Sequence, residues 1–315
     1  MNILFIADPL ASFKIYKDTT FAMMREAQKR GHQIFACEPH HLVWQSGQAV
    51  NAQVQQVHLT GARDKWFEAQ GVHADRALHS FDAVVMRKDP PFDSEYFYAT
   101  HLLEQAEREG AKVFNKPSAL RNHPEKLAIL EFAQFISPTL VTRDAQAIRA
   151  FHTVHRDIIL KPLDGMGGMG IFRVKDDALN LGAIIETLNH EGAQTVMVQK
   201  FLPAIAQGDK RVLVIGGKVV PYCLARIPQG GEVRGNLAAG GKGVAQAISA
   251  RDKEIAEAIG PGLAQRGLLL IGLDVIGENL TEINVTSPTC FQEIFDQAGC
   301  DVAALFIDAL EHAAA

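Results

Sequence analysis

Cysteine is scarce in this sequence, and long apolar runs are missing from it. Its 315 residues include four cysteines, none in a C-x-x-C pair, which argues against a disulfide framework or zinc site and favours reduced, mostly buried thiols. The opening MNILFIADPL is apolar for about five positions before Asp8, too short for the core of a signal peptide. No other stretch approaches a membrane span. We therefore expect a cytoplasmic protein with no membrane partner.

An excess of basic residues is also missing. The formal net charge is −5, with 21% charged and 47% hydrophobic residues, which is typical of a soluble globular chain. Mild acidity argues against a nucleic-acid partner, so any anion must be bound by a local cluster. The 12 histidines contain no H-E-x-x-H pattern, and the pair His40 and His41 is interpreted as a surface turn rather than a metal site. No histidine is assigned a catalytic role.

The N-terminal part alternates between strand and helix patterns. A buried strand NILFIA leads to a helix DTTFAMMREAQKRG, which begins at Asp18 or Thr19 and ends at Gly31, and then to a strand QIFAC. A further strand FDAVVMR, a helix SEYFYATHLLEQAEREG and a strand AKVFN follow. This order predicts an open parallel α/β sheet over residues 1 to about 120.

The remaining chain predicts smaller, mixed units. A helix PEKLAILEFAQF precedes a strand near TLV, a helix DAQAIRAFHTV, two strands around a glycine loop, a helix LNLGAIIETLNHEG and a strand TVMVQKFL. Two β-rich runs then meet in a hairpin at Gly216 and Gly217. The glycine-rich stretch PQGGEVRGNLAAGGKG follows, and we expect it to be mobile. After it come a helix DKEIAEAIGPGLAQRG, a β pair LLLIGLDVIGENLTEINV and a closing helix from about Asp301. We expect boundaries near residues 122 and 200.

The stretch KPLDGMGGMG contains a literal G-x-G-x-x-G at Gly165, Gly167 and Gly170. In a dinucleotide fold these glycines open a helix whose N-terminus receives the pyrophosphate. Here IFRV follows, and its β-branched and aromatic residues predict a strand instead. A glycine loop between antiparallel strands can cover phosphates, with Lys161 as their charge partner. The alternative is a flexible hairpin with a surface lysine.

A second cluster lies in LDVIGENLTEIN. Glu282 and Asn284 are two positions apart, so a strand places both side chains on one face. If the turn has three residues, 277–279, Asp274 lies opposite Glu282, with Cβ atoms within about 5.5 Å. A two-residue turn instead pairs Asp274 with Ile283 and separates the carboxylates. These hard oxygen donors indicate a site for magnesium with nucleotide phosphates, and the alternative is a set of acids solvated by water.

These features together resemble an ATP-grasp ligase. MRKDPPFDSEY, ILKPLDGMGG, DKRVLVIGGKVVPYCLARIPQGGEVRGNLAAGG and LDVIGENLTEINVTSPT resemble the bacterial type of glutathione synthetase, and the similarity runs from Met1 to near the C-terminus. The resemblance implies an ATP-grasp fold with three units. These are an N-terminal α/β substrate-binding unit (1–122), a central lid with the glycine loop (123–200), and a C-terminal antiparallel catalytic unit (201–315) with a flexible loop 227–242.

The resemblance also implies a reaction. ATP phosphorylates the cysteinyl carboxylate of γ-glutamylcysteine, and the amine of glycine displaces phosphate to give glutathione. ATP is a co-substrate, Mg²⁺ is the cofactor with Mn²⁺ as a substitute, and the assembly is a homotetramer. The nucleotide half of such a site is shared across the superfamily, so a ligase for another amino acid or peptide is the close alternative. A nucleotide-binding module without turnover is a more distant one.

Site residues follow by resemblance at matching positions. Phosphate-contacting lysines, an adenine-binding linker and a ribose-contacting acid are expected, together with the metal ligands already derived from strand parity. Two arginines would neutralise the transferring phosphoryl group, and two lid residues would help to exclude water. The candidates for substrate binding lie at the end of an N-terminal strand and directly after the strand that carries Glu282 and Asn284. The nucleotide set is Lys126, Lys161, Gly165, Gly167, Gly168, Gly170, Gln199, Lys200, Leu202 and Asp209; the metal set is Asp274, Glu282 and Asn284; the catalytic set is Arg211, Arg226, Arg234 and Asn236; and the substrate set is Arg87, Thr286 and Ser287.

Met169 departs from the small residue expected at its position in the glycine loop. The sequence therefore does not predict the detailed path of that loop.

Overall fold

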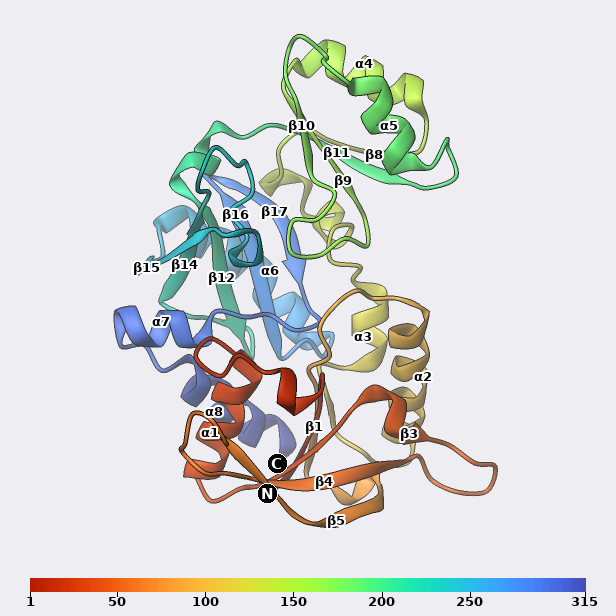
Figure 1. Cartoon of the computed structure of the whole chain (residues 1–315), viewed down its shortest axis with the longest axis vertical. Coiled ribbons are helices and arrows are strands. Elements are labelled where there is room, and N and C mark those ends of the chain that lie inside the picture. The colour runs from red at the N-terminus through yellow and green to blue at the C-terminus, as the bar shows by residue number, and fades with distance from the viewer.

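The computed structural model contains three β-sheets stacked along the long axis of the molecule, with helices on their faces (Figure 1). It describes the backbone of residues 1–315 and the side chains of residues 1–71 and 73–315. Each sheet is formed by a different part of the chain, so the places where the sheets face one another bring together residues that are distant in sequence.

The N-terminal sheet has the strand order β3-β4-β2-β1-β6-β7, with β5 paired to β4. Its parallel part is the predicted one. The sequence did not predict that β3, β4 and β5 extend this sheet as antiparallel strands. The strands are β1 Asn2–Ile6, β2 Gln33–Cys37, β3 Leu42–Val43, β4 Asn51–Leu59, β5 Phe67–Ala77, β6 Ala83–Met86 and β7 Val113–Phe114.

Local capping explains the two helices of this unit. Asp18 accepts a hydrogen bond from Phe21 N at 2.7 Å at the start of α1 (Thr19–Lys29), and Asp93 accepts one from Tyr96 N at 2.9 Å at the start of α2 (Ser94–Arg108). Gly31, just past α1, has a φ of +81°, a conformation that disfavours residues with a Cβ. Both helices therefore begin where the sequence predicted.

The central sheet is a small antiparallel layer with the order β10-β9-β11-β8. Helices α4 (Ala145–His155) and α5 (Leu181–Asn189) cover it at the top of Figure 1. Their apolar sides share one core with the sheet, which includes Ile148, Leu160 and Ile185. The strands are β8 Thr139–Thr142, β9 Ile158–Pro162, β10 Phe172–Val174 and β11 Val196–Lys200.

The third sheet has the order β15-β14-β12-β16-β17, and β13 pairs with β12 through the predicted turn at Gly216 and Gly217. Helix α6 (Ala250–Gln265) packs on β12, β13 and β16. The strands are β12 Asp209–Ile215, β13 Lys218–Val219, β14 Tyr222–Ile227, β15 Lys242–Ala247, β16 Leu270–Ile276 and β17 Asn279–Asn284.

The segment between the first two sheets differs from the prediction. After α3 (Pro117–Asn122), the expected helix PEKLAILEFAQF is a 3-10 helix, Ala128–Phe135, interrupted at Phe132 (φ −123°, ψ 45°). This 3-10 helix packs against β17, and Ile136 after it forms a β-bridge with Leu280. Tertiary packing on the third sheet thus overrides the local preference for an α-helix.

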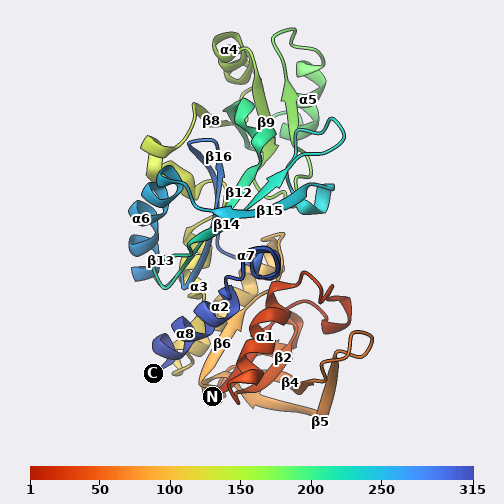
Figure 2. The same cartoon turned by 90° about the vertical axis from the view of Figure 1, so that its left-hand side faces the viewer.

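The end of the chain returns to the N-terminal unit. Helix α8 (Val302–Ala314) begins at Asp301 as predicted and packs against α1 (Figure 2). Helix α7 (Phe291–Ala298) was not predicted; its N-cap, Cys290, has a φ of +90° and makes no side-chain capping bond, so no start signal marks it. One core includes Phe5, Phe291 and Phe306 and therefore joins the first and last parts of the chain.

A buried asparagine joins the first sheet to the third. The Asn115 side chain, directly after β7, donates to Leu270 O at 2.8 Å and to Val285 O at 2.7 Å, and accepts from Leu270 N at 2.9 Å. All three hydrogen bonds of this amide go to residues on β16 or just after β17. This contact fixes the end of β17 against the N-terminal unit.

The expected buried thiols and the expected turn at His40 and His41 are confirmed. Three cysteines are buried free thiols, and Cys300 is partly buried. His40 lies in a short 3-10 turn with its side chain 67% exposed. None of the helices in the described part of the chain has both the length and the apolarity that crossing a bilayer requires.

Candidate active site

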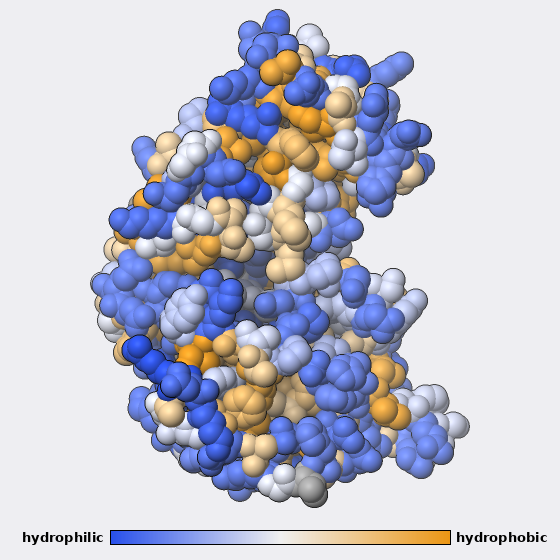
Figure 3. Space-filling model, in the orientation of Figure 1, coloured by the Kyte–Doolittle hydropathy of each residue, from blue (hydrophilic) through white to orange (hydrophobic). Residues whose placement is uncertain are grey.

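A cavity of about 540 Å³ lies where the three sheets meet. Figure 3 shows the molecular surface indented between the part that carries α4 and α5 and the rest of the molecule. The cavity lining includes every site residue expected from the sequence except Gly170. These residues are Arg87, Lys126, Lys161, Gly165, Gly167, Gly168, Gln199, Lys200, Leu202, Asp209, Arg211, Arg226, Arg234, Asn236, Asp274, Glu282, Asn284, Thr286 and Ser287.

The glycine loop connects two antiparallel strands. Phe172 in β10 pairs with Leu160 in β9, so a strand follows the loop as predicted. Gly168 has a φ of +84° and Gly170 one of +70°, and a Cβ on Gly170 would come within 3.1 Å of the Pro162 ring. Gly170 therefore shapes the base of the loop rather than the cavity wall, whereas Met169 is 63% exposed and needs no buried space.

Two lysines approach the cavity beside this loop. Lys161, at the end of β9, donates to Thr281 O at 3.2 Å, and Lys126 donates to Gly165 O at 2.5 Å and to Glu282 Oε1 at 3.2 Å. Burial lowers the pKa of Lys161, although Glu282 opposes that effect. An anionic ligand would supply the countercharge that a buried ammonium needs. The flexible hairpin with a surface lysine is therefore wrong, because Lys161 is only 6% exposed.

The carboxylates face each other through a register that the sequence did not predict. The hairpin turn has two residues, Gly277 and Glu278, since Ile276 pairs with Asn279. A bulge between Asp274 and Val275 then shifts the register and places Asp274 opposite Glu282. The expected pairing is confirmed, but the three-residue turn proposed for it was wrong.

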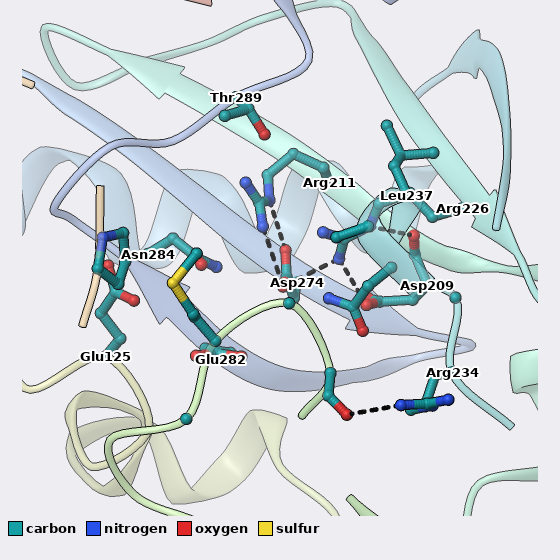
Figure 4. A pocket seen from close by; sticks show the side chains of 18 of the residues that line it. Glu125, Asp209, Arg211, Arg226, Arg234, Leu237, Asp274, Glu282, Asn284 and Thr289 are labelled. Carbon is teal, nitrogen blue, oxygen red and sulfur yellow. Dashed lines mark hydrogen bonds and ion pairs between the residues drawn. The ribbon is translucent and has the colours of Figure 1, made fainter. Parts of the chain in front are cut away.

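Two buried arginines hold Asp274 (Figure 4). Arg211 donates from Nε to Oδ1 at 2.6 Å and from Nη2 to Oδ2 at 3.2 Å, while Arg226 Nη2 lies 2.9 Å from Oδ2. Despite the opposing effect of burial, these guanidiniums hold the pKa of Asp274 well below its usual range. Arg226 also donates to Asp209 Oδ2 at 2.5 Å. Each guanidinium has five N–H donors, so both arginines keep donors for a further anion.

Asp209 behaves differently from Asp274. Burial raises its pKa to about 6; Arg226 opposes the shift, but the negative charge of Asp274 adds to it. Its Oδ1 atom is buried without a hydrogen-bond partner. A carboxyl group with an unused oxygen in the cavity can bind a hydroxyl group, as the expected role toward the ribose requires.

The raised pKa of Asp209 predicts a pH-dependent stability difference. The unfolded carboxyl titrates near 3.8 and the folded one near 6, so its stabilising contribution is fully present below pH 3.8 and is lost as the pH rises to about 6. We expect the free energy of unfolding of the wild type, minus that of Asp209→Asn, to fall over this interval. Urea unfolding of both proteins across the interval measures the difference, and a constant value would contradict the shift.

The oxygen donors at this place fit a divalent cation. Asp274, Glu282 and Asn284 line one cavity, and carboxylate and amide oxygens are the ligands that Mg²⁺ prefers. Asn284 Nδ2 donates to Gly272 O at 3.2 Å, which leaves its Oδ1 as an acceptor. Within the part of the chain that the structure describes, no three His, Cys, Asp or Glu side chains cluster as a metal site. A cation here would therefore depend on the amide as well as on the two carboxylates.

The second glycine-rich loop, residues 228–241, touches the first. Arg234 Nη1 donates to Gly168 O at 3.4 Å. A Cβ on Gly168 would lie 2.8 Å from Asn236 Oδ1 and 3.3 Å from Arg234 Cδ. The two loops therefore meet beside the cavity, and Gly168 lies at their contact.

The opposite end of the cavity belongs to the N-terminal unit. Arg87, which is 4% exposed, donates to Thr20 Oγ1 at 3.1 Å and to Pro288 O at 3.0 Å. Ser287 Oγ donates to Asp89 Oδ1 at 2.5 Å. The bonds to Pro288 and Ser287 hold the segment after β17 against the N-terminal unit. Burial lowers the pKa of Arg87 despite the nearby Asp89 and Asp18.

Several cavity residues were missed from the sequence. Asp18 was interpreted only as a helix cap, and Asp89 only as part of a motif. Glu125 directly precedes the expected Lys126, and Glu293 lies in the unpredicted α7, with its Oε2 buried without a partner. Proximity to a recognised lysine was the one available signal for Glu125; the others depend on the tertiary fold.

The glycine hairpin and its lysine, facing a carboxylate pair across a cleft between two antiparallel sheets, define an ATP-grasp ligase. The fold is similar to that of D-cycloserine synthetase DcsG (TM-score 0.68, 15% identity, 100% of each chain covered). It is also similar to that of the ATP-grasp ligase PsnB complexed with a minimal precursor (TM-score 0.63, 20% identity, 99% of each chain covered).

Sequence comparisons define the family. Residues 1–121 match the prokaryotic glutathione synthetase N-terminal domain, and residues 125–299 match the prokaryotic glutathione synthetase ATP-grasp domain. Glutathione synthetase of Ralstonia nicotianae is 60% identical over 314 residues (100% of this chain, 96% of the relative), and that of Neisseria meningitidis serogroup A is 58% identical (98% of each). The chain belongs to the prokaryotic glutathione synthetase family. It is an ATP-dependent ligase that makes glutathione.

Proposed function

We propose that this chain joins γ-glutamylcysteine to glycine through an acyl phosphate formed in the cavity at the meeting of the three sheets. The observation that carries the proposal is the position of Lys126 and Lys161 beside the Asp274–Glu282 pair, with Arg211 and Arg226 behind it. The lysines on one side and the arginines on the other can stabilise the negative charge of a phosphoryl group during its transfer from a nucleotide to a carboxylate. The family membership supports the same reaction.

The chemistry needs an activated carboxylate. A free carboxylate repels a nucleophile, and oxide is a very poor leaving group. In the proposed reaction the cysteinyl carboxylate attacks the terminal phosphorus of ATP, ADP leaves, and the glycine amine then attacks the acyl carbon and releases phosphate. Arg211 and Arg226 would bind the oxygens of the transferring group with their remaining N–H donors.

The metal and nucleotide assignments belong to this proposal. Asp274, Glu282 and Asn284 would hold Mg²⁺, with Mn²⁺ as a substitute, and the cation would neutralise charge on the nucleotide phosphates. Asp209 would bind the ribose. The linker at the end of β11 would bind the adenine through Gln199, Lys200 and Leu202, which line the cavity.

The substrate end is proposed for the dipeptide. Arg87 is a buried cation in the lining, and Thr286 and Ser287 supply hydroxyl groups near it. A buried guanidinium suits one of the substrate carboxylates. The division into units 1–122, 123–200 and 201–315, the homotetramer and the cytoplasmic location implied by the resemblance remain predictions.

Phosphate release tests the function directly. Purified protein with ATP, Mg²⁺ and γ-glutamylcysteine is expected to release phosphate in quantity only when glycine is added, with one glutathione formed per phosphate. Lack of glycine-dependent release would refute the proposed reaction. Activity with a different amino acid in place of glycine would indicate the related ligase instead, and nucleotide binding without turnover would indicate a binding module.

The loop over the cavity predicts a coupling effect. Because Arg234 and Asn236 meet the glycine loop at Gly168, we expect the loop to exclude water from the acyl phosphate. Deleting residues 229–241 should raise the ratio of phosphate to glutathione well above one, or stop both reactions. Assays of both products measure this ratio. A deletion in the exposed turn 45–48, outside the cavity, is the control, and full coupling without the lid residues would remove the loop from the mechanism.

A further inference from the structure

Glu125 connects the two halves of the cavity through its own atoms. Its carbonyl oxygen accepts a hydrogen bond from Ile283 N at 3.0 Å, within β17. One side-chain oxygen, Oε1, accepts three more, from Val285 N at 2.9 Å, Thr286 N at 3.0 Å and Thr286 Oγ1 at 2.8 Å. A single residue thus fixes the backbone on both sides of Asn284.

The residue next to it reaches the nucleotide half. Lys126 contacts Glu282 Oε1 and the carbonyl oxygen of Gly165 in the glycine loop. The pair 125–126 therefore contacts the glycine loop, the end of β17 and the segment 285–287. That segment carries Thr286 and Ser287 and lies at the substrate end of the cavity.

We propose that Glu125 is a positioning residue, which sets the substrate segment 285–287 at a fixed place relative to the phosphate-binding Lys126 and the carboxylates of β16 and β17. The inference rests on the proposed function. It adds that the acyl group and the phosphoryl group meet productively only while Oε1 holds these three donors. Small displacements of reacting groups are costly, since a shift of about 1 Å can slow a reaction about 100-fold.

The contacts of Glu125 require a side chain long enough to place an oxygen at this position, and they do not require a negative charge. Three N–H and O–H donors converge on one oxygen, and a neutral amide oxygen at the same place can accept them as well. Burial and the nearby Glu282 raise the pKa of Glu125, whereas the hydrogen bonds from Thr286 and Val285 oppose that shift. A role that needed the negative charge, such as accepting a proton from the glycine amine, would show a different response to substitution.

Two substitutions separate reach from charge. Glu125→Gln keeps the length and the accepting oxygen, whereas Glu125→Asp keeps the charge but shortens the side chain by one methylene. We expect kcat of Glu125→Gln to stay close to that of the wild type. We expect kcat of Glu125→Asp to fall about 10- to 100-fold, with a higher KM for γ-glutamylcysteine and an unchanged KM for ATP. Glu131→Ala is the matched control, because Glu131 lies on the 3-10 helix just after Glu125 and pairs with Arg266 on the exposed surface.

The outcomes are distinguishable. Full activity of Glu125→Asp, or a loss in Glu125→Gln as large as that in Glu125→Asp, would overturn the positioning role, and the second result would assign a role to the charge. Thermal unfolding checks the fold of each variant. If Glu125→Asp does not fold, Thr286→Val decides: it removes one of the three donors, and an unchanged kcat would overturn the proposal. A wild type that makes no glutathione would refute the proposed function itself, and the positioning role would fall with it.

Discussion

Glutathione formation by the Glu282→Gln variant is expected to fall about 100- to 1,000-fold, because the substitution removes the negative charge opposite Asp274 without changing the size of the side chain. An amide keeps one oxygen but replaces the other with an N–H donor group, so both the expected cation and Lys126 lose their anionic partner. Steady-state assays of glutathione and phosphate measure the effect. The thermal unfolding midpoint should change little, since Glu282 is partly exposed to the cavity.

Glu278→Gln is the matched control for this prediction. Glu278 lies in the two-residue turn of the same hairpin, and its side chain is exposed outside the cavity. The control should keep wild-type activity. Undiminished activity of Glu282→Gln would refute the assignment of Glu282 to the metal and phosphate site, whereas equal losses in both variants would indicate general damage to the hairpin.

The largest effect on stability is expected for Asp274→Asn. Its side chain is 4% exposed and holds Arg211 and Arg226, so the variant leaves two buried guanidiniums that repel each other without their shared anion. Removing one partner of such a buried group costs about 3–5 kcal/mol in the free energy of unfolding. Urea unfolding near neutral pH measures the loss, and activity should fall with it.

Asp157→Asn separates this effect from the loss of any arginine pair. Asp157 accepts two hydrogen bonds from Arg173, at 2.9 and 2.6 Å, but both side chains are partly exposed. Solvent weakens such a pair, so the control should cost less than about 1 kcal/mol. Similar small losses in both variants would mean that the arginine cluster in the cavity is better solvated than its burial indicates.

The glycine loop shows how far local sequence patterns reach. IFRV after Gly170 predicted a strand, and that one prediction excluded the dinucleotide reading of the G-x-G-x-x-G pattern. The alternation in β4, by contrast, was overlooked, although Ala52 and Val54 are buried two positions apart, and so are Val57 and Leu59, with a register shift between the two pairs. A strand with few large apolar residues and a break in its alternation gives a weak signal.

The Asp274–Glu282 pair shows what local patterns cannot predict. The positions of Asp274, Glu282 and Asn284 in two strands follow from their sequence, but their register follows from a bulge. A bulge depends on how both strands pack against the rest of the sheet. The right pairing was therefore reached with the wrong turn.

Glu125 and Glu293 show the same limit more strongly. Neither residue belongs to a pattern with a period, and each reaches the cavity through contacts that span more than a hundred residues or through a helix without a start signal. Sequence patterns report neighbours along the chain, whereas these side chains have their partners across it.

The sequence by itself determined the class of most elements, the identity of the lysines and carboxylates that line the cavity, and, through its motifs, the family. The tertiary structure alone decided the antiparallel extension of the first sheet, the return of α7 and α8 to the N-terminal unit, and the meeting of the two glycine-rich loops at Gly168. The physical reason is the distance along the chain over which each kind of interaction acts. Periodicity and capping act over a few residues, whereas register, burial and convergence on one cavity are set by packing between segments that the chain places far apart.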